Sequence, residues 1–163
     1  MNFTANTIRS SLRNFLCGIV VGTLCIAPTF STNAESLSKG QISNMSNING
    51  YSYTAQNTID TGLEGSSSYK YARAYTNINA NTNVPGGFMG VYARLFDSAG
   101  NAVSITDWYY NPSNRSGISN SAELLYLSGT PAYRSQGYVK VWNGTDYWTY
   151  NTFATPYLND YTS

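Results

Sequence analysis

From Tyr51 onward, apolar residues alternate with polar ones, and this pattern limits the fold more than any other feature of the sequence. A period of two places successive side chains on opposite faces of a β-strand, whereas an amphipathic helix needs a period near 3.6. Gly, Asn, Asp and Pro interrupt the pattern about every ten to fifteen residues, as turns between strands would. No window has a convincing helical period, so the chain is predicted to be all-β.

Seven segments combine this alternation with β-branched or aromatic residues and are predicted to be strands. Seven antiparallel strands in one domain favour a single antiparallel β-sandwich, with a small β-barrel as the alternative. Two long polar loops are expected at residues 79–87 and 111–120, and such loops often carry binding residues on a rigid scaffold. The predicted strands are Tyr51–Asn57, Ser67–Ile78, Phe88–Phe96, Val103–Tyr110, Ala122–Leu127, Gly137–Trp142 and Tyr147–Ala154.

Two of these segments indicate which face of the strand is buried. In Phe88–Phe96 an unbroken apolar row is expected to face the core, while Tyr92 and Arg94 point the other way. In Ser67–Ile78 the row that contains Ala72, Ala74, Thr76 and Ile78 is expected to pack against a second sheet. The opposite row would then be exposed, and it consists of Tyr69, Tyr71, Arg73 and Tyr75.

The N-terminal residues have the three parts of a secretory signal peptide. Arg9 and Arg13 supply positive charge, Phe15–Ala27 is apolar, and small residues precede a cleavage position after Ala34. The apolar run is shorter than the roughly 20 residues that a spanning helix needs. We therefore predict a signal peptide at residues 1–34, a flexible N-terminal arm or poorly ordered first strand at 35–50, and the β-sandwich domain at 51–163. The mature protein would be secreted, with no transmembrane span.

Cleavage after Ala34 would remove Cys17 and Cys25, which leaves a mature domain without thiols or disulfides. Secreted eukaryotic domains commonly depend on disulfides, so this composition favours a bacterial protein. Loss of Arg9 and Arg13 would lower the number of basic residues from 9 to 7 against 8 acidic residues, a net charge of −1. That balance argues against electrostatic binding of nucleic acid.

The absence of histidine from all 163 residues removes the commonest general base and the usual zinc ligand. A glycosidase with paired carboxylates would remain possible if Asp107 and Glu123 lay on neighbouring strands. Carboxylates in small domains more often serve solubility or turns, and the acidic stretches at residues 60–65 and 97–101 are too sparse for a calcium loop. We expect a protein that is not an enzyme, with no catalytic residue, no metal site and no cofactor.

The segment YVKVWNGTDYWTY, Tyr138 to Tyr150, has five aromatic residues around the hairpin signal Asn143-Gly144. A two-residue turn or a four-residue loop would place Tyr138, Lys140, Trp142 and Tyr147 on one face. Val139, Val141, Trp148 and Tyr150 would then lie on the opposite, core-facing side. A three-residue loop would reverse the second strand and move Trp148 and Tyr150 beside Lys140.

In every register, large aromatic side chains share the outer face with Lys140. Flat rings flanked by polar groups suit carbohydrate binding, because the C–H surfaces of sugars stack on rings. Tyr138, Lys140, Trp142 and Tyr147 are therefore the candidate ligand-binding residues, for cell-wall polysaccharide or another extracellular glycan. Cross-strand aromatic pairs that only stabilise the sheet are the competing explanation. The alternative functions are a bacteriocin-like or envelope-active toxin and a structural protein of the extracellular matrix.

Overall fold

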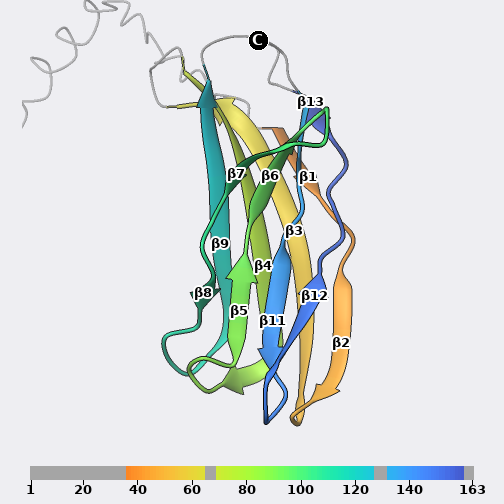
Figure 1. Ribbon diagram of the computed structural model, residues 1–163, viewed down its shortest axis with the longest axis vertical. Helices are drawn as coiled ribbons and strands as arrows, with labels where there is room; N and C mark the ends of the chain where they lie inside the picture. Colours follow the sequence, from red (N-terminus) through yellow and green to blue (C-terminus); the bar gives the residue numbers. More distant parts are fainter. Residues whose placement is uncertain (1–35, 65–68, 127–131, 160–163) are drawn as a thin grey trace, which may run out of the picture. The chain divides into compact units, whose positions relative to one another are not determined.

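The described residues form antiparallel strands that are joined into three sheets, and they contain no helix (Figure 1). The computed structural model describes residues 36–64, 69–126 and 132–159. The predicted signal peptide and its cleavage position lie outside this part of the chain. No helix in the described ranges has the length and apolar character required to cross a bilayer.

Sheet 1 forms one layer and is built around two long paired strands, β3 and β4. The order is β1-β3-β4-β9, and β2 pairs with the lower part of β3 on the same edge as β1. Buried residues alternate with less buried ones from Ser52 to Ile59 in β3 and from Ala72 to Ile78 in β4, which gives each strand one buried face. The five strands are β1 (Ser36–Lys39), β2 (Ser43–Ile48), β3 (Tyr51–Leu63), β4 (Lys70–Val84) and β9 (Arg115–Tyr126).

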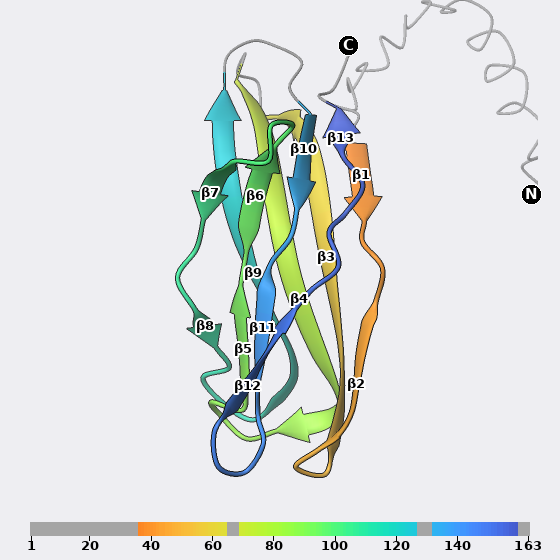
Figure 2. The same cartoon turned by 45° about the vertical axis from the view of Figure 1, so that its right-hand side comes forward.

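Sheets 2 and 3 together form the second layer and meet end to end (Figure 2). Sheet 2 has the order β12-β11-β5-β8, and sheet 3 has the order β13-β10-β6-β7. The strands of sheet 2 are β5 (Met89–Tyr92), β8 (Tyr109–Tyr110), β11 (Tyr138–Trp142) and β12 (Tyr147–Asn151). The strands of sheet 3 are β6 (Arg94–Asp97), β7 (Ala102–Ile105), β10 (Ala132–Ser135) and β13 (Leu158–Asn159).

The junction between sheets 2 and 3 is a local irregularity rather than a gap. Ala93 alone separates β5 from β6, and Gln136 and Gly137 separate β10 from β11. Backbone hydrogen bonds continue through the junction, from the Gln136 N–H to the Arg94 carbonyl at 3.1 Å and from the Thr106 N–H to the Ala93 carbonyl at 3.1 Å. The second layer therefore acts as one four-stranded surface with a bend in the middle.

The two layers enclose a core in two parts. One cluster fills the space between sheet 1 and sheet 2, and includes Ile78, Met89, Val139 and Val141. The other lies between sheet 1 and sheet 3, and includes Ile59, Ala74 and Leu95. Buried polar residues separate the two clusters at the level of the junction; they include Asn57, Thr76, Ser135 and Thr152.

The predicted β-sandwich is confirmed, and none of the described sheets closes into a barrel. The predicted burial of Phe88–Phe96 is also confirmed, because Met89, Val91, Ala93 and Leu95 are fully buried. In β4 the row of small residues from Ala72 to Ile78 faces the core as predicted. Tyr71 differs from the expectation of an exposed tyrosine row, since its ring is buried beside Gly62 and beneath Arg73.

The structure corrects the predicted arm and loops. Within residues 36–48, β1 and β2 pair with β3 and bury Met45 and Ile48, so the segment is not a flexible arm, and the alternative of a strand describes it better. The expected loop at 79–87 is strand as far as Val84, and that at 111–120 is strand from Arg115 onward. Strands β10 and β13 were not predicted. The segments 36–48, 79–84 and 115–121 are rich in Ser, Thr and Asn, and they become strands because paired neighbours satisfy their backbone groups.

Candidate functional site

The hairpin of β11 and β12 has a four-residue loop, which sets the faces of both strands. Trp142 pairs with Tyr147, and the register continues to Tyr138 opposite Asn151. The Asn143 side-chain oxygen accepts the N–H groups of Thr145 and Asp146 at 2.8 and 2.9 Å. Gly144 takes a φ of 103°, which favours glycine. The loop is longer than the simplest two-residue turn but gives the same division of faces.

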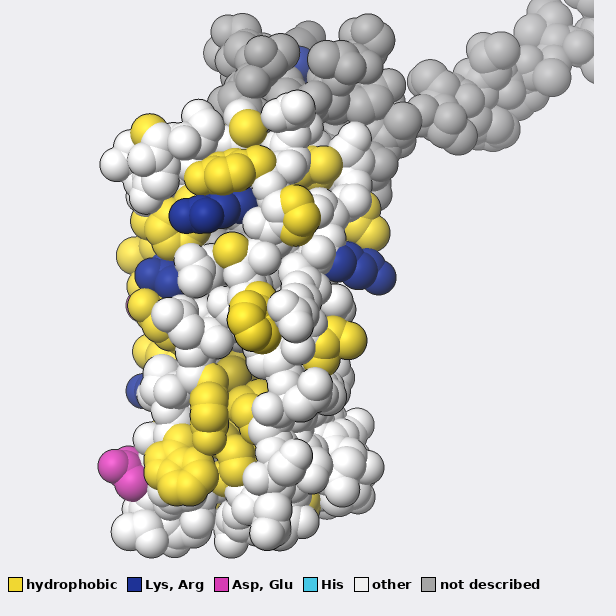
Figure 3. Space-filling model, turned by 90° about the vertical axis from the view of Figure 1, so that its right-hand side faces the viewer, with side chains coloured by type: hydrophobic (Ala, Val, Ile, Leu, Met, Phe, Trp, Pro, Cys, Tyr) yellow, Lys and Arg dark blue, Asp and Glu magenta, His cyan; other side chains and the backbone are white. Residues whose placement is uncertain are grey.

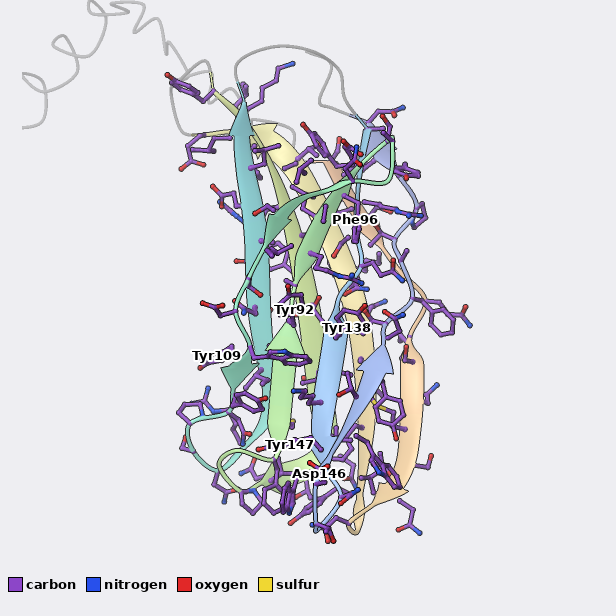
Figure 4. The ribbon with its side chains drawn as sticks, in the orientation of Figure 1. Tyr92, Phe96, Tyr109, Tyr138, Asp146 and Tyr147 are labelled. Atoms are coloured by element: carbon purple, nitrogen blue, oxygen red, sulfur yellow. The ribbon has the colours of Figure 1, made fainter. Side chains whose placement is uncertain are left out.

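All four candidate residues lie half-buried on the outer face of sheet 2. Tyr138, Lys140 and Trp142 alternate along β11, and Tyr147 is opposite Trp142 on β12. Figure 4 shows Tyr138 on β11 near the middle of the layer and Tyr147 close to the lower end. The structure therefore brings these residues onto one surface.

The expected burial of Trp148 is wrong. Val139 and Val141 on the core face of β11 are fully buried, but Trp148 on the same face of β12 is 51% exposed. The reason is that β12 is the edge strand of sheet 2, so Trp148 has a neighbouring strand of that sheet on one side only. From the side that carries β2 and β12, hydrophobic side chains form separate groups among polar ones (Figure 3).

Aromatic residues from two other strands extend the surface beyond the hairpin. Tyr92 on β5 lies opposite Tyr138, with ring centroids 6.1 Å apart. Trp108, which precedes β8, lies 5.5 Å from Tyr92 and 6.2 Å from Tyr110, and Tyr110 lies 5.4 Å from Tyr147. We call this set the aromatic face; its members are Phe88, Tyr92, Trp108, Tyr110, Tyr138, Trp142 and Tyr147.

Contacts at the lower end of the aromatic face hold its rings in position. Trp142 contacts Tyr147 edge-on at 5.2 Å and Phe88 at 6.4 Å. The Tyr147 hydroxyl donates a hydrogen bond of 2.6 Å to the Gly87 carbonyl. Burial raises the pKa of Tyr147, and the neighbouring Tyr110 raises it further. Tyr147 therefore stays neutral and hydrogen-bonded at physiological pH.

A shallow hollow of about 330 Å³ opens among these rings. Its walls are Tyr92, Trp108 and Tyr138, with Arg94 and Thr149 as the polar groups at its edge. Lys140 crosses the neighbouring surface, where its ammonium lies 4.3 Å from the Trp108 ring centroid and 3.5 Å from the Tyr110 hydroxyl. The hollow therefore combines ring faces with hydrogen-bond donors.

Sequence reasoning placed Tyr92 and Arg94 on an outer face but did not join them to the hairpin. The missing information was the pairing of β5 with β11, which brings together residues far apart in the chain. Trp108 and Tyr110 alternate at the end of a predicted strand, and that spacing was the only available signal for them.

A larger hollow, of about 630 Å³, lies on the outer face of sheet 1. Amide and hydroxyl side chains dominate its lining, which includes Gln56, Thr58, Asn77, Asn79 and Ser119. Its described lining has no aromatic ring on which a sugar could stack.

Two of the acidic residues considered for catalysis or metal binding, Glu123 and Asp97, make contacts with other residues of the structure. The Glu123 carboxylate accepts a bond from Arg73 on the outer face of sheet 1. The Asp97 carboxylate accepts the Asn101 N–H at 2.8 Å, and this contact lowers the pKa of Asp97 while it shapes the β6–β7 turn. Across the described ranges, no three side chains among His, Cys, Asp and Glu are grouped closely enough to hold a metal.

Comparison of the chain with protein-family models, with curated proteins and with solved structures finds no significant match in any of the three.

Proposed function

We propose that this protein is exported and binds an extracellular glycan, such as a cell-wall polysaccharide, through the aromatic face. The observation that carries the proposal is the hollow of about 330 Å³ with Tyr92, Trp108 and Tyr138 in its walls. Ring surfaces suit the C–H faces of sugars, while Arg94 and Thr149 at the edge offer partners for hydroxyl groups. A glycan-binding protein of this kind needs no catalytic residue or cofactor.

Rigid support makes the rings of the aromatic face suitable for binding. Each ring of the aromatic face contacts at least one neighbouring ring, so little side-chain freedom is left to lose when a ligand docks. The supporting residues lie on or beside paired strands rather than long loops, and such sites are held more accurately. The same contacts also stabilise the sheet, so the two roles are compatible.

Retention on washed bacterial cell walls and insoluble polysaccharides, with soluble glycans as competitors, tests the proposal. We expect saturable retention that a soluble competitor reverses. Substitution of two rings at the lower end of the aromatic face, Trp142→Ala with Tyr147→Ala, should weaken affinity at least about tenfold, or about 1.4 kcal/mol. Trp108→Ala, in the wall of the hollow, should do the same.

Trp148→Ala is the matched control, because Trp148 belongs to the same hairpin and is exposed but lies outside the aromatic face. Its affinity should equal that of the wild type. Far-UV circular dichroism and urea unfolding establish that each variant is folded before its affinity is compared. Absence of retention on every surface would overturn the proposal, as would full affinity in a folded Trp142→Ala, Tyr147→Ala variant.

The same purified protein distinguishes the two alternative functions. An envelope-active toxin would inhibit bacterial growth or release dye from vesicles. A matrix protein would assemble as its concentration rises. A glycan-binding protein should do neither under the conditions in which it is retained on polysaccharide.

A further inference from the structure

We infer that the glycan bound by the aromatic face is acidic, with carboxylate or phosphate groups that contact a row of three cations. This inference rests on the proposed function and adds the chemical class of the ligand. The cations are Lys140, Arg94 and Arg134, from β11, β6 and β10.

Each of the three cations lies against aromatic rings on the outer surface of the second layer. The Lys140 ammonium is 4.3 Å from the Trp108 ring centroid. The Arg94 guanidinium is 4.2 Å from the ring of Tyr138 and 5.0 Å from that of Phe96. The Arg134 guanidinium continues the series, at 5.7 Å from Phe96 and 5.0 Å from Tyr157.

Strand pairing arranges the cations in a line across the junction of sheets 2 and 3. Lys140 on β11 is opposite Gly90 on β5. Arg94 lies four residues beyond Gly90, at the start of β6. At about 3.3 Å per residue this places the backbones of the two residues about 13 Å apart along the strands. Arg134 is opposite Phe96, about 7 Å beyond Arg94. An extended polymer lying along the face would meet the cations in turn.

No carboxylate in the described part of the chain lies within ion-pair distance of these three cations. The acidic residues near the ends of the face, Asp97 and Asp146, are bonded to backbone N–H groups within their own turns. The Nε atom of Arg134 is buried without a hydrogen-bond partner among the described residues. Among the described residues, the three cations of the row are therefore not engaged in a direct ion pair.

Arg73 on sheet 1 provides a contrast to Arg94 and Arg134. Arg73 also lies over a ring, 4.8 Å from the Tyr71 centroid, but its guanidinium is paired with the Glu123 carboxylate. Arginine can bind carboxylate or phosphate with two parallel hydrogen bonds, and partial burial strengthens such contacts. The Arg94 Nε donates to the Gln136 carbonyl at 3.2 Å, and the Arg134 Nε is buried, so the terminal nitrogens of the two guanidiniums are the groups that would bind an acidic ligand.

The decisive comparison uses polygalacturonic acid and its fully methyl-esterified form, which share a backbone and differ in charge. A polyglycerol-phosphate polymer is the third probe, and it distinguishes phosphate from carboxylate as the preferred anion. We expect at least tenfold tighter binding to one or both acidic polymers than to the ester. This preference should disappear between about 0.01 M and about 1 M NaCl, where the screening length falls from about 30 Å to about 3 Å.

Substitutions then test whether the preference for acidic polymers depends on this row of cations. Arg94→Gln with Arg134→Gln should lower affinity for the acidic polymer at least tenfold. Arg73→Gln removes one cation from the other layer and should leave that affinity unchanged. The salt dependence of the wild-type protein provides an independent test if the double variant does not fold.

The outcomes separate this inference from the proposed function. Equal binding of acid and ester would overturn the acidic-ligand inference and leave glycan binding intact. Undiminished acid binding by a folded Arg94→Gln, Arg134→Gln variant would overturn the assignment to this row. Absence of binding to all polymers and to cell walls would overturn the proposed function as well.

Discussion

The side-chain amide of Asn57 donates a hydrogen bond of 2.6 Å to the hydroxyl of Thr152, and both residues are buried between the layers. The Asn57 oxygen accepts the Thr76 hydroxyl at 2.9 Å, and its nitrogen also donates to the Phe153 carbonyl at 2.7 Å. The Thr152 hydroxyl donates to the Gly137 carbonyl at 2.8 Å. This network ties β3 and β4 to the irregular segments of the second layer, and so fixes the junction above the aromatic face.

Asn57→Ala should lower the free energy of unfolding by about 3 kcal/mol. The substitution leaves a small cavity and removes partners from Thr76, Thr152 and the Phe153 carbonyl in a buried site. Urea unfolding measures the loss. Asn77→Ala, on the outer face of the neighbouring strand, is the control and should change stability by no more than about 0.5 kcal/mol. A loss below about 1 kcal/mol for Asn57→Ala would show that the network contributes little.

Gly137→Ala should destabilise the protein by at least about 2 kcal/mol because the junction has no room for a side chain. A Cβ atom at position 137 would collide with the Thr76 hydroxyl oxygen and with the Tyr92 carbonyl oxygen. Gly86→Ala is the comparison, since the nearest atom to its Cβ would be the Pro112 carbonyl oxygen at 3.3 Å. Thermal unfolding midpoints of the two variants should therefore differ clearly, and equal midpoints would contradict the close approach seen here.

The alternation of residues predicted the sandwich and the buried face of Phe88–Phe96, because a period of two depends only on the strand itself. It predicted a loop where residues 115–120 form a strand, and only a flexible arm or poorly ordered first strand where residues 36–48 form β1 and β2. Those segments are rich in Ser and Asn, which have weak β-propensity, and they are held by pairing with β3 and β4. Pairing with neighbouring strands, and not local composition, therefore determines that these residues form strands.

The four candidate residues of the hairpin share a face for a local reason, since loop length fixes the register of β11 against β12. The rest of the aromatic face depends on long-range pairing. Tyr92 meets Tyr138 only because β5 lies beside β11, and the order of strands in a sandwich cannot be read from one strand at a time. The exposure of Trp148 has the same origin, because it depends on β12 being an edge strand.

The ion pair between Arg73 and Glu123 should contribute only about 0.5 kcal/mol to stability. Both side chains are partly exposed, at 27% and 36%, so solvent screens their attraction. A double-mutant cycle with Arg73→Gln and Glu123→Gln measures the coupling, which should fall further in about 1 M NaCl. A coupling above about 2 kcal/mol that is insensitive to salt would show that the pair is effectively buried.

Tyr53→Phe should leave stability at neutral pH unchanged or raise it by up to about 1 kcal/mol. The Tyr53 side chain is 2% exposed, and its hydroxyl has no hydrogen-bond partner among the described residues. Phenylalanine keeps the ring and removes a polar group whose burial is unfavourable. Tyr51→Phe, on the neighbouring partly exposed ring, controls for the general effect of removing a hydroxyl. A loss of more than about 1 kcal/mol would indicate that the Tyr53 hydroxyl has a partner.

Stability should decline above pH 10 because burial, with a smaller effect from Tyr51, raises the pKa of Tyr53 to about 12 from its usual 10.0. Below pH 10 both states hold the proton. Between pH 10 and 12 the unfolded state loses it while the folded state keeps it, so unfolding becomes easier by about 1.4 kcal/mol per pH unit. Urea unfolding at pH 9 and pH 11 should therefore show a loss about 1.4 kcal/mol larger in the wild type than in Tyr53→Phe. Equal losses in the two proteins would mean that Tyr53 ionises as readily in the folded state as in the unfolded chain.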